Sequence, residues 1–336
     1  MPVEPFVVRH IEIVCDESGF SGGNLVGVGH SPVFAHASIC IEPQTGAQLV
    51  QQLRREIGAR GTGEYKSPEI MRPRRRPVLL WLLGPTSPIY GNAYVHLTDT
   101  QFFVLARLVD VLLGGQPVSG ITSPGRNAGT RPMALALYKL GEHSYGTPRW
   151  QEFLKLSANL FRTNNRWLPK TPVQNFYTAV DSLAETSAAS DVREVMRMLQ
   201  STRPIAETTR ASYLQHPKLT PLMEPLLPAL NRAVQVWGSR AASLSVIHDE
   251  QSALTAERIA DIATAYAANQ PGRQLTDVQL VDSSREPRVQ IADFVAGIAC
   301  RLASDQLQDR ADREISALLG PLIDPESVWV DYKTWH

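Results

Sequence analysis

Apolar positions near both ends of the chain follow the pattern of β-strands. Residues 11–16 (IEIVCD) are mostly apolar and run directly into serine and glycine, which predicts a buried strand that enters a turn. Residues 33–42 (VFAHASICIE) predict a second strand, placed as the hairpin partner of the first. Residues 244–249 (LSVIHD) and 278–282 (VQLVD) predict two more strands far along the chain.

Apolar residues at helical spacing fill most of the remaining chain. Proline at position 43 suits a first helical turn, and Leu49, Leu53 and Ile57 recur every four positions, which predicts a helix over 43–57. The same spacing predicts helices over 100–113, 256–268 and 289–303, and an almost entirely helical stretch from about 131 to 242. The layout predicts an α/β core formed by residues 1–124 and 240–336, with an all-helical insertion over 125–239.

Composition places the chain among globular proteins. Its 336 residues include 33 Lys and Arg and 33 Asp and Glu, which argues against a polybasic nucleic-acid coat but allows a local basic groove. Apolar residues make up 43% and charged residues 20%, as is typical of a packed domain. The longest apolar run, 78–83, is too short to cross a bilayer, and the N-terminus lacks the pattern of a secretory signal. Three distant cysteines favour a reducing compartment, so we expect a cytoplasmic protein.

Three aspartates stand where the pattern predicts buried structure. Asp16 ends the first predicted strand, where a carboxylate is costly unless it is paired, hydrogen-bonded or metal-bound, although Asp-Glu-Ser-Gly also suits a plain turn. Asp249 ends the strand over 244–249 in the same way, so parallel neighbouring strands would bring Asp16 and Asp249 to one edge. Asp293 lies in a helix that is apolar on nearly all sides, with no Lys or Arg three or four positions away. Such an acid needs a distant partner, a proton or a metal ion.

Two further segments carry candidate residues. Glu64 would complete an acidic cluster, and Lys66 would contact a phosphate or orient the attacking water; the alternative is an exposed charged loop. The nearby Arg72, Arg74 and Arg75 either grip the phosphates of a nucleic acid or form a solvated surface run. Their closeness in sequence to Lys66 favours contact with a substrate.

The types of donor atom indicate which metal would bind. Carboxylates from separate strands and a helix suit Mg²⁺ or Mn²⁺, and the eight scattered histidines show no zinc spacing. Two such ions about 3.5–4 Å apart activate a water and stabilise the leaving oxygen in phosphodiester hydrolysis. The pattern GxxxxGK[ST] does not occur, so P-loop chemistry has no support.

These segments together resemble a family known as domain of unknown function 3800. The matching pieces are residues 15–19 (CDESG), 64–66 (EYK), 247–250 (IHDE), 281–283 (VDS) and, most specific of all, 290–297 (QIADFVAG). They follow the family's order and span both ends of the chain, whereas about 125–239 matches nothing. Many members have another acid where this chain has Phe20, so the resemblance gives no additional ligand from that turn.

The resemblance implies a ribonuclease H-like fold, a mixed sheet flanked by helices, with a carboxylate cluster that binds divalent metal. Asp16 would then bridge the metals from the first strand, and Glu64, Asp249 and Asp293 would supply the remaining ligands. The superfamily includes nucleases, transposases and inactive relatives, so the fold alone does not fix the activity.

We therefore expect a Mg²⁺- or Mn²⁺-dependent nuclease that hydrolyses RNA or DNA. Its expected catalytic residues are Asp16, Glu64, Lys66, Asp249 and Asp293. The alternative is a non-catalytic ribonuclease H-like binding module, because the net charge is zero and the turn acid is missing. A homo-oligomer, or a subunit with a partner in a defence or toxin system, is compatible with either function.

Overall fold

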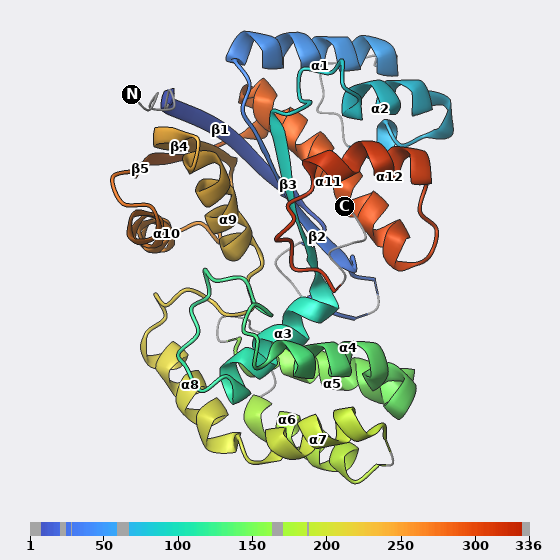
Figure 1. Ribbon diagram of the computed structural model, residues 1–336, viewed down its shortest axis with the longest axis vertical. Helices are drawn as coiled ribbons and strands as arrows, with labels where there is room; N and C mark the ends of the chain where they lie inside the picture. Colours follow the sequence, from blue (N-terminus) through green and yellow to red (C-terminus); the bar gives the residue numbers. More distant parts are fainter. Residues whose placement is uncertain are drawn as a thin grey trace, which may run out of the picture.

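The protein has a five-stranded mixed sheet with helices on both faces and a helical block at one end (Figure 1). The computed structural model describes residues 8–20, 25–27, 29–58, 67–162, 171–186 and 188–330. The strands are β1 (Val8–Ser18), β2 (Val33–Ile39), β3 (Ala93–Asp99), β4 (Ala241–Asp249) and β5 (Gln274–Val281). They lie in the order β3-β2-β1-β4-β5; β2 is antiparallel to both neighbours, whereas β1, β4 and β5 run parallel. The α/β class and the β1–β2 pairing are confirmed.

One face of the sheet packs against α11 (Pro287–Leu307), which crosses β1 and β2. Val14, Ala37 and Val295 are fully buried in the core between the strands and this helix. Helices α1 (Pro43–Ile57), α2 (Arg76–Leu83) and α12 (Arg313–Leu319) complete the layer.

The opposite face packs against α9 (Leu226–Gly238), with α10 (Ala256–Asn269) alongside. Ile13, Cys15 and Val246 belong to this second core. Because successive residues of a strand point to opposite faces, Asp16 shares the α11 side with Val14 and not the α9 side with Cys15.

The helical block has a third core of its own, in the lower half of Figure 1. Stacked rings mark its centre, for example Trp150 and Phe153 with centroids 5.1 Å apart. Its helices are α3 (Thr100–Leu113), α4 (Arg131–Tyr145), α5 (Thr147–Leu160), α6 (Pro172–Ala184), α7 (Ser190–Gln200) and α8 (Arg203–Gln215). We expected α3 in the core and α9 in the insertion, but α3 packs into the block and α9 covers the sheet. The packing therefore changes at α3 and α9 rather than at residues 125 and 239.

Several elements have the bounds expected from their apolar spacing. The helices over 43–57 and 100–113 begin and end as predicted, while β1, β4 and β5 begin earlier than expected and α11 is longer at both ends. Strand β3 was not predicted, because its polar His96 and Thr98 are buried and interrupt the apolar pattern. Short 3₁₀ helices complete the chain at Ser67–Glu69, Pro73–Arg75, Ser283–Arg285 and Gly320–Leu322.

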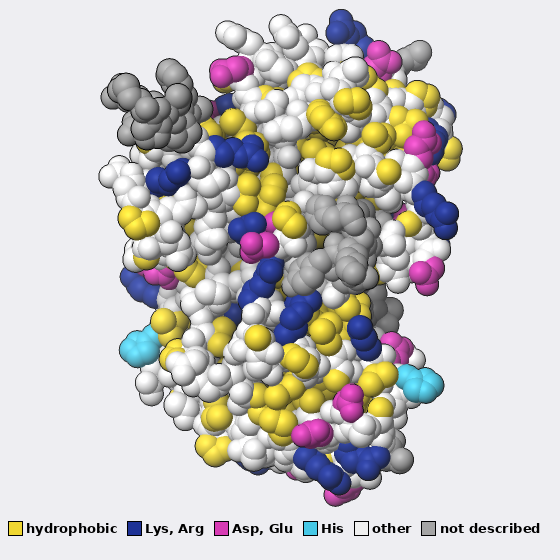
Figure 2. Space-filling view, viewed as in Figure 1, with side chains coloured by type: hydrophobic (Ala, Val, Ile, Leu, Met, Phe, Trp, Pro, Cys, Tyr) yellow, Lys and Arg dark blue, Asp and Glu magenta, His cyan; other side chains and the backbone are white. Residues whose placement is uncertain are grey.

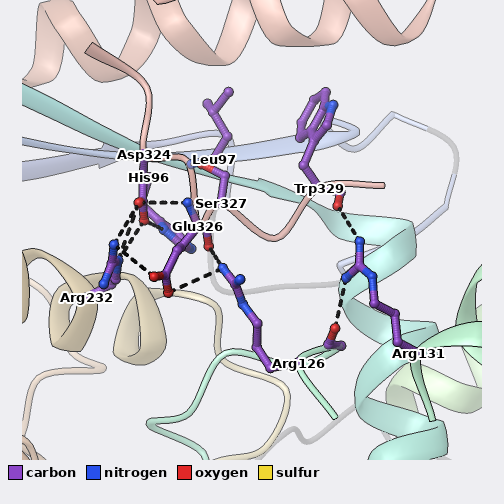
Figure 3. Close-up of polar contacts among 10 residues, drawn as sticks. His96, Leu97, Arg126, Arg131, Arg232, Asp324, Glu326, Ser327 and Trp329 are labelled. Carbon is purple, nitrogen blue, oxygen red and sulfur yellow. Dashed lines mark hydrogen bonds and ion pairs between the residues drawn. The ribbon is translucent and has the colours of Figure 1, made fainter. Parts of the chain in front are cut away.

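The C-terminal segment lies along the outer edge of β3 and covers it (Figure 3). The amide of Asp324 donates to the Val95 carbonyl at 2.8 Å. The buried Asp324 carboxylate accepts from His96 Nδ1 at 2.8 Å and from Arg232 Nε at 3.1 Å. Covering an edge strand removes a template for unwanted strand pairing.

Basic side chains cross the middle of one face, where the sheet and the helical block meet (Figure 2). Figure 3 shows three arginines at this junction, and each bonds to the C-terminal segment. Arg232 pairs with Asp324, Arg126 donates to the Glu326 carbonyl, and Arg131 donates to the Trp329 carbonyl at 3.4 Å. These three arginines therefore hold the fold together.

Candidate metal centre

Two aspartates lie side by side at the carboxyl ends of β1 and β4. The parallel register pairs Cys15 with His248, so Asp16 and Asp249 take the next equivalent positions, on strands about 4.8 Å apart. The Oδ1 atom of Asp16 accepts from the Glu17 amide at 2.7 Å, and Oδ1 of Asp249 accepts from the Ser283 amide at 3.0 Å. The expected meeting of Asp16 and Asp249 at one edge is confirmed.

Asp293 reaches the same edge from α11. It is half-buried, while Ala292, Phe294 and Ala296 around it are buried. Its charge is close enough to raise the pKa of Asp16. Residues far apart in the sequence, on two strands and a helix, thus bring three aspartates to one region.

The electrostatics around Asp16 are strongly unfavourable to its charged form. Its side chain is buried, and the pKa is raised to about 9. Burial is the main cause, and the negative charges of Glu17, Asp293 and Asp249 raise the pKa further, while the Glu17 amide lowers it. Such a group of acids is costly unless a proton or a cation neutralises it.

Two glycines let other parts of the chain approach this site closely. Gly19 has a φ of +97°, and a side chain there would collide with the Val33 carbonyl, which explains the glycine of Asp-Glu-Ser-Gly. At Gly297, one helical turn after Asp293, a side chain would collide with Ser67. Ser67 is the first described residue after 59–66, so the chain leaves that stretch directly against α11.

The remaining predicted residues have different positions. Glu64 and Lys66 lie outside the described residues, so their roles stay predictions. Arg72 and Arg74 are exposed, and Arg72 pairs with Glu69. The position of Arg75 does not fit the phosphate contact that we expected of it.

Arg75 is buried and its guanidinium serves the fold. It donates to the Ile57 carbonyl at 2.6 Å and to Glu69 Oε2 at 2.7 Å. A guanidinium that bridges the end of α1 to the Ser67–Glu69 helix is poorly placed to bind a substrate phosphate. We therefore correct the prediction and assign Arg75 a structural role.

Buried imidazoles lie on the other side of the sheet at this edge, a feature that we did not predict. The rings of His36 and His248 stack with Nε2 atoms 3.3 Å apart, and His248 Nδ1 donates to the Asp249 carbonyl at 2.9 Å. Burial, then the neighbouring His248 and His96, lowers the pKa of His36, so this ring is neutral. Glu17 Oε2 lies 3.7 Å from His248 Nε2. Because side chains alternate along β1, Glu17 lies on the face of the sheet opposite to Asp16. This alternation is the signal in the sequence that could have placed Glu17 among the residues of the other face.

Within the described ranges, no three His, Cys, Asp or Glu side chains are close enough together to hold a metal ion. The same residues include no helix long and apolar enough to span a membrane. Comparison with family models, curated proteins and solved structures gave no match for this chain. The family resemblance therefore depends on the motifs alone.

Proposed function

We propose that the protein is a divalent-metal-dependent nuclease with a ribonuclease H-like fold, which hydrolyses phosphodiester bonds in RNA or DNA. The observation that carries the proposal is the group of mutually repelling acids around buried Asp16. Asp249 and Asp293 contribute to it from β4 and α11. Acids gathered at the carboxyl ends of parallel strands are the arrangement that a hard cation would stabilise.

The sheet topology supports the same proposal. Its order is β3-β2-β1-β4-β5, and β2 is the one strand of the described sheet that runs opposite to the others. This is the arrangement expected of a ribonuclease H-like protein. In this interpretation the helices α4–α8 are an insertion between the third and fourth strands.

Asp16, Asp249 and Asp293 would hold the metal, and Glu64 would complete the set. Carboxylate oxygens are the donors that Mg²⁺ and Mn²⁺ prefer, so the donor chemistry fits. No three of the described side chains form such a group, so an ion bound by two of these aspartates would need Glu64 as its third carboxylate. When bound, the metal would activate a water and stabilise the leaving oxygen.

The protein's own side chains would orient the reaction. The amides of Glu17 and Ser283 fix one oxygen each of Asp16 and Asp249, which leaves these carboxylates little freedom to rotate. Lys66 would contact the phosphate or orient the water, and the exposed Arg72 and Arg74 would bind neighbouring phosphates.

A cleavage assay tests the proposal. Purified protein should cleave labelled RNA or DNA in the presence of Mg²⁺ or Mn²⁺, and addition of EDTA should stop the cleavage. Asp16→Asn and Asp293→Asn should each lower the rate roughly hundredfold or more, because each removes a charged metal ligand. Asp277→Asn is the matched control, since Asp277 is an exposed aspartate of the neighbouring strand β5. Full activity in both site variants would refute the proposal.

A non-catalytic binding module is the second candidate. The absence of a three-ligand group among the described residues favours it. Calorimetry that finds no Mg²⁺ or Mn²⁺ binding, together with tight binding of an intact nucleic acid, would support this candidate over the nuclease.

A further inference from the structure

A cavity of about 290 Å³ lies between the α9 face of the sheet and the helical block, at the carboxyl end of β1. Its core side includes Glu17 and, two residues after Asp249, Gln251. Phe161 and Glu224 are on the opposite side, from the connections after α5 and before α9. The α/β part and the helical block meet at this level in Figure 1.

The cavity and the aspartates share the same two strand ends. Glu17 directly follows Asp16, with Cα atoms about 3.8 Å apart and side chains on opposite faces of the sheet. Gln251 Nε2 donates to Glu17 Oε1 at 2.5 Å, which ties the segment after β4 to the end of β1. A nucleic-acid strand that passes around this end of the sheet, with a phosphate at the aspartates on the α11 face, would bring a neighbouring base to the cavity on the α9 face.

The cavity has charges of both signs. Glu17 and Glu224 supply carboxylates, and Arg162 and Arg258 supply guanidiniums. Burial raises the pKa of Glu224 to about 7, even though the Leu226 amide and Arg162 lower it. Glu17 Oε2 is buried and has no hydrogen-bond donor among the described residues. A simple anion or a simple cation would meet a like charge here, so the best ligand carries both donors and acceptors.

Aromatic side chains and the cavity's size indicate a flat ring. Phe20, Phe34, Phe161 and Tyr213 all line the cavity. The volume is at the lower end of ligand pockets, which begin at about 300 Å³, and suits one heterocycle rather than a larger molecule. Stacking on aromatic rings is the usual way in which proteins hold unpaired bases.

We propose that this cavity holds an unpaired guanine base of the nucleic-acid strand bound at the aspartates, a proposal that rests on the nuclease function above. Guanine offers N1–H and an amino group on one edge for Glu17 and Glu224, and O6 and N7 on another edge for Arg162 and Arg258. Adenine lacks the ring N–H and the carbonyl, and the pyrimidines have a smaller stacking surface.

Binding measurements in EDTA test the cavity without any need for catalysis. Calorimetry of the full chain with GMP, AMP, CMP and UMP should give a Kd for GMP about tenfold lower than for the others. Glu224→Gln should weaken GMP binding about tenfold, and Tyr213→Leu, which removes a ring, should weaken it independently. Glu207→Gln is the control, because Glu207 is an exposed residue of α8 that pairs with Arg203. Equal affinity for all four nucleotides, with no effect of Glu224→Gln, would overturn the proposal.

Oligonucleotides separate the cavity from the nuclease activity. In EDTA, a 12-nucleotide strand with one guanine should bind more tightly than one with none, and with Mn²⁺ the cut should fall at a fixed distance from the guanine. Guanine-selective binding without any cleavage would support the cavity and refute the nuclease. Cleavage at sites unrelated to guanine would overturn the proposal for the substrate strand, even if free GMP binds.

Discussion

Asp16 and Asp249 lie at equivalent positions on two parallel strands, each one residue beyond the Cys15–His248 pair. Like charges directly across neighbouring strands destabilise a sheet, and here burial increases the cost. Burial is the main cause of the raised pKa of Asp16, followed by the charges of Glu17 and Asp293, and Asp249 contributes least. The protein therefore gives up stability at this edge, as proteins commonly do at functional sites.

Removing one of these charges should stabilise the metal-free protein. Asp16→Asn should raise the free energy of unfolding in EDTA at pH 8 by about 0.5–2 kcal/mol, because the natural carboxyl must take up a proton to be buried beside Glu17, Asp293 and Asp249, whereas the unfolded chain leaves it charged. Urea denaturation measures this change. Asp277→Asn, on an exposed position of β5, should have no such effect. A loss of stability in Asp16→Asn would show that the carboxylate is paired favourably without metal.

The close contact of α11 with Ser67 gives a second prediction. An alanine in a helix is normally more stable than glycine by up to about 1 kcal/mol. At Gly297 the added methyl group would collide with Ser67, so Gly297→Ala should destabilise the protein by about 1–3 kcal/mol and slow metal-dependent cleavage. Urea denaturation and the cleavage assay measure the two effects.

A compensating variant checks the cause. Ser67→Gly removes the side-chain atoms that the new methyl group would meet, so the double variant should regain most of the lost stability. A single variant Gly297→Ala as stable as the natural protein would contradict the close packing of Ser67 on α11.

The buried hydrogen bond between His96 and Asp324 gives a prediction for the dependence of stability on pH. Asp324 has a fully buried side chain that bonds to His96 and Arg232. Asp324→Asn should cost about 2–4 kcal/mol at pH 7, because both partners lose a charged acceptor. Glu326→Gln, with a half-exposed side chain paired to the same Arg232, should cost less than about 1 kcal/mol.

The pH dependence of this cost follows from the pKa of Asp324. Burial raises this pKa, but the bonds to His96 and Arg232 lower it more, so it lies below its usual value. A lowered carboxylate pKa contributes stability above the unfolded-state value of about 3.9, and that stability is lost as the pH falls through the folded-state value. The difference between the natural protein and Asp324→Asn should therefore shrink as the pH falls below about 4. A difference that grows with acidity would contradict this assignment.

Local pattern predicted single elements better than their assembly. The helices over 43–57 and 100–113 and the end of β4 at Asp249 follow from apolar spacing within short segments, whereas β1 continues two residues past Asp16 to Ser18. Strand β3 was not predicted, because its polar residue His96 is buried against Asp324, 228 residues away. The polarity of His96 therefore does not indicate an exposed position. The burial of Arg75 likewise depends on the Ile57 carbonyl, which an arginine-rich run does not reveal. Packing between distant segments decided each of these cases.

The candidate site likewise has a part that the sequence predicted and a part that it did not. The pairing of Asp16 with Asp249 was predictable, because both residues follow apolar runs near the carboxyl ends of strands, and neighbouring parallel strands end at one edge. The cavity was not, because Glu17 and Glu224 come together only when the helical block packs beside the sheet. The contribution of Glu64 remains a prediction, since it lies outside the described residues.

Direct measurement of metal binding tests the central claim. Titration of the purified protein with Mn²⁺, followed by the electron paramagnetic resonance signal of free Mn²⁺, counts bound ions without a substrate. We predict one or two bound ions per chain at pH 8, lost or weakened at least about tenfold in both Asp16→Asn and Asp293→Asn and retained in Asp277→Asn. No bound Mn²⁺ in the natural protein, or equal binding in all four proteins, would contradict the proposal that these aspartates form a metal centre.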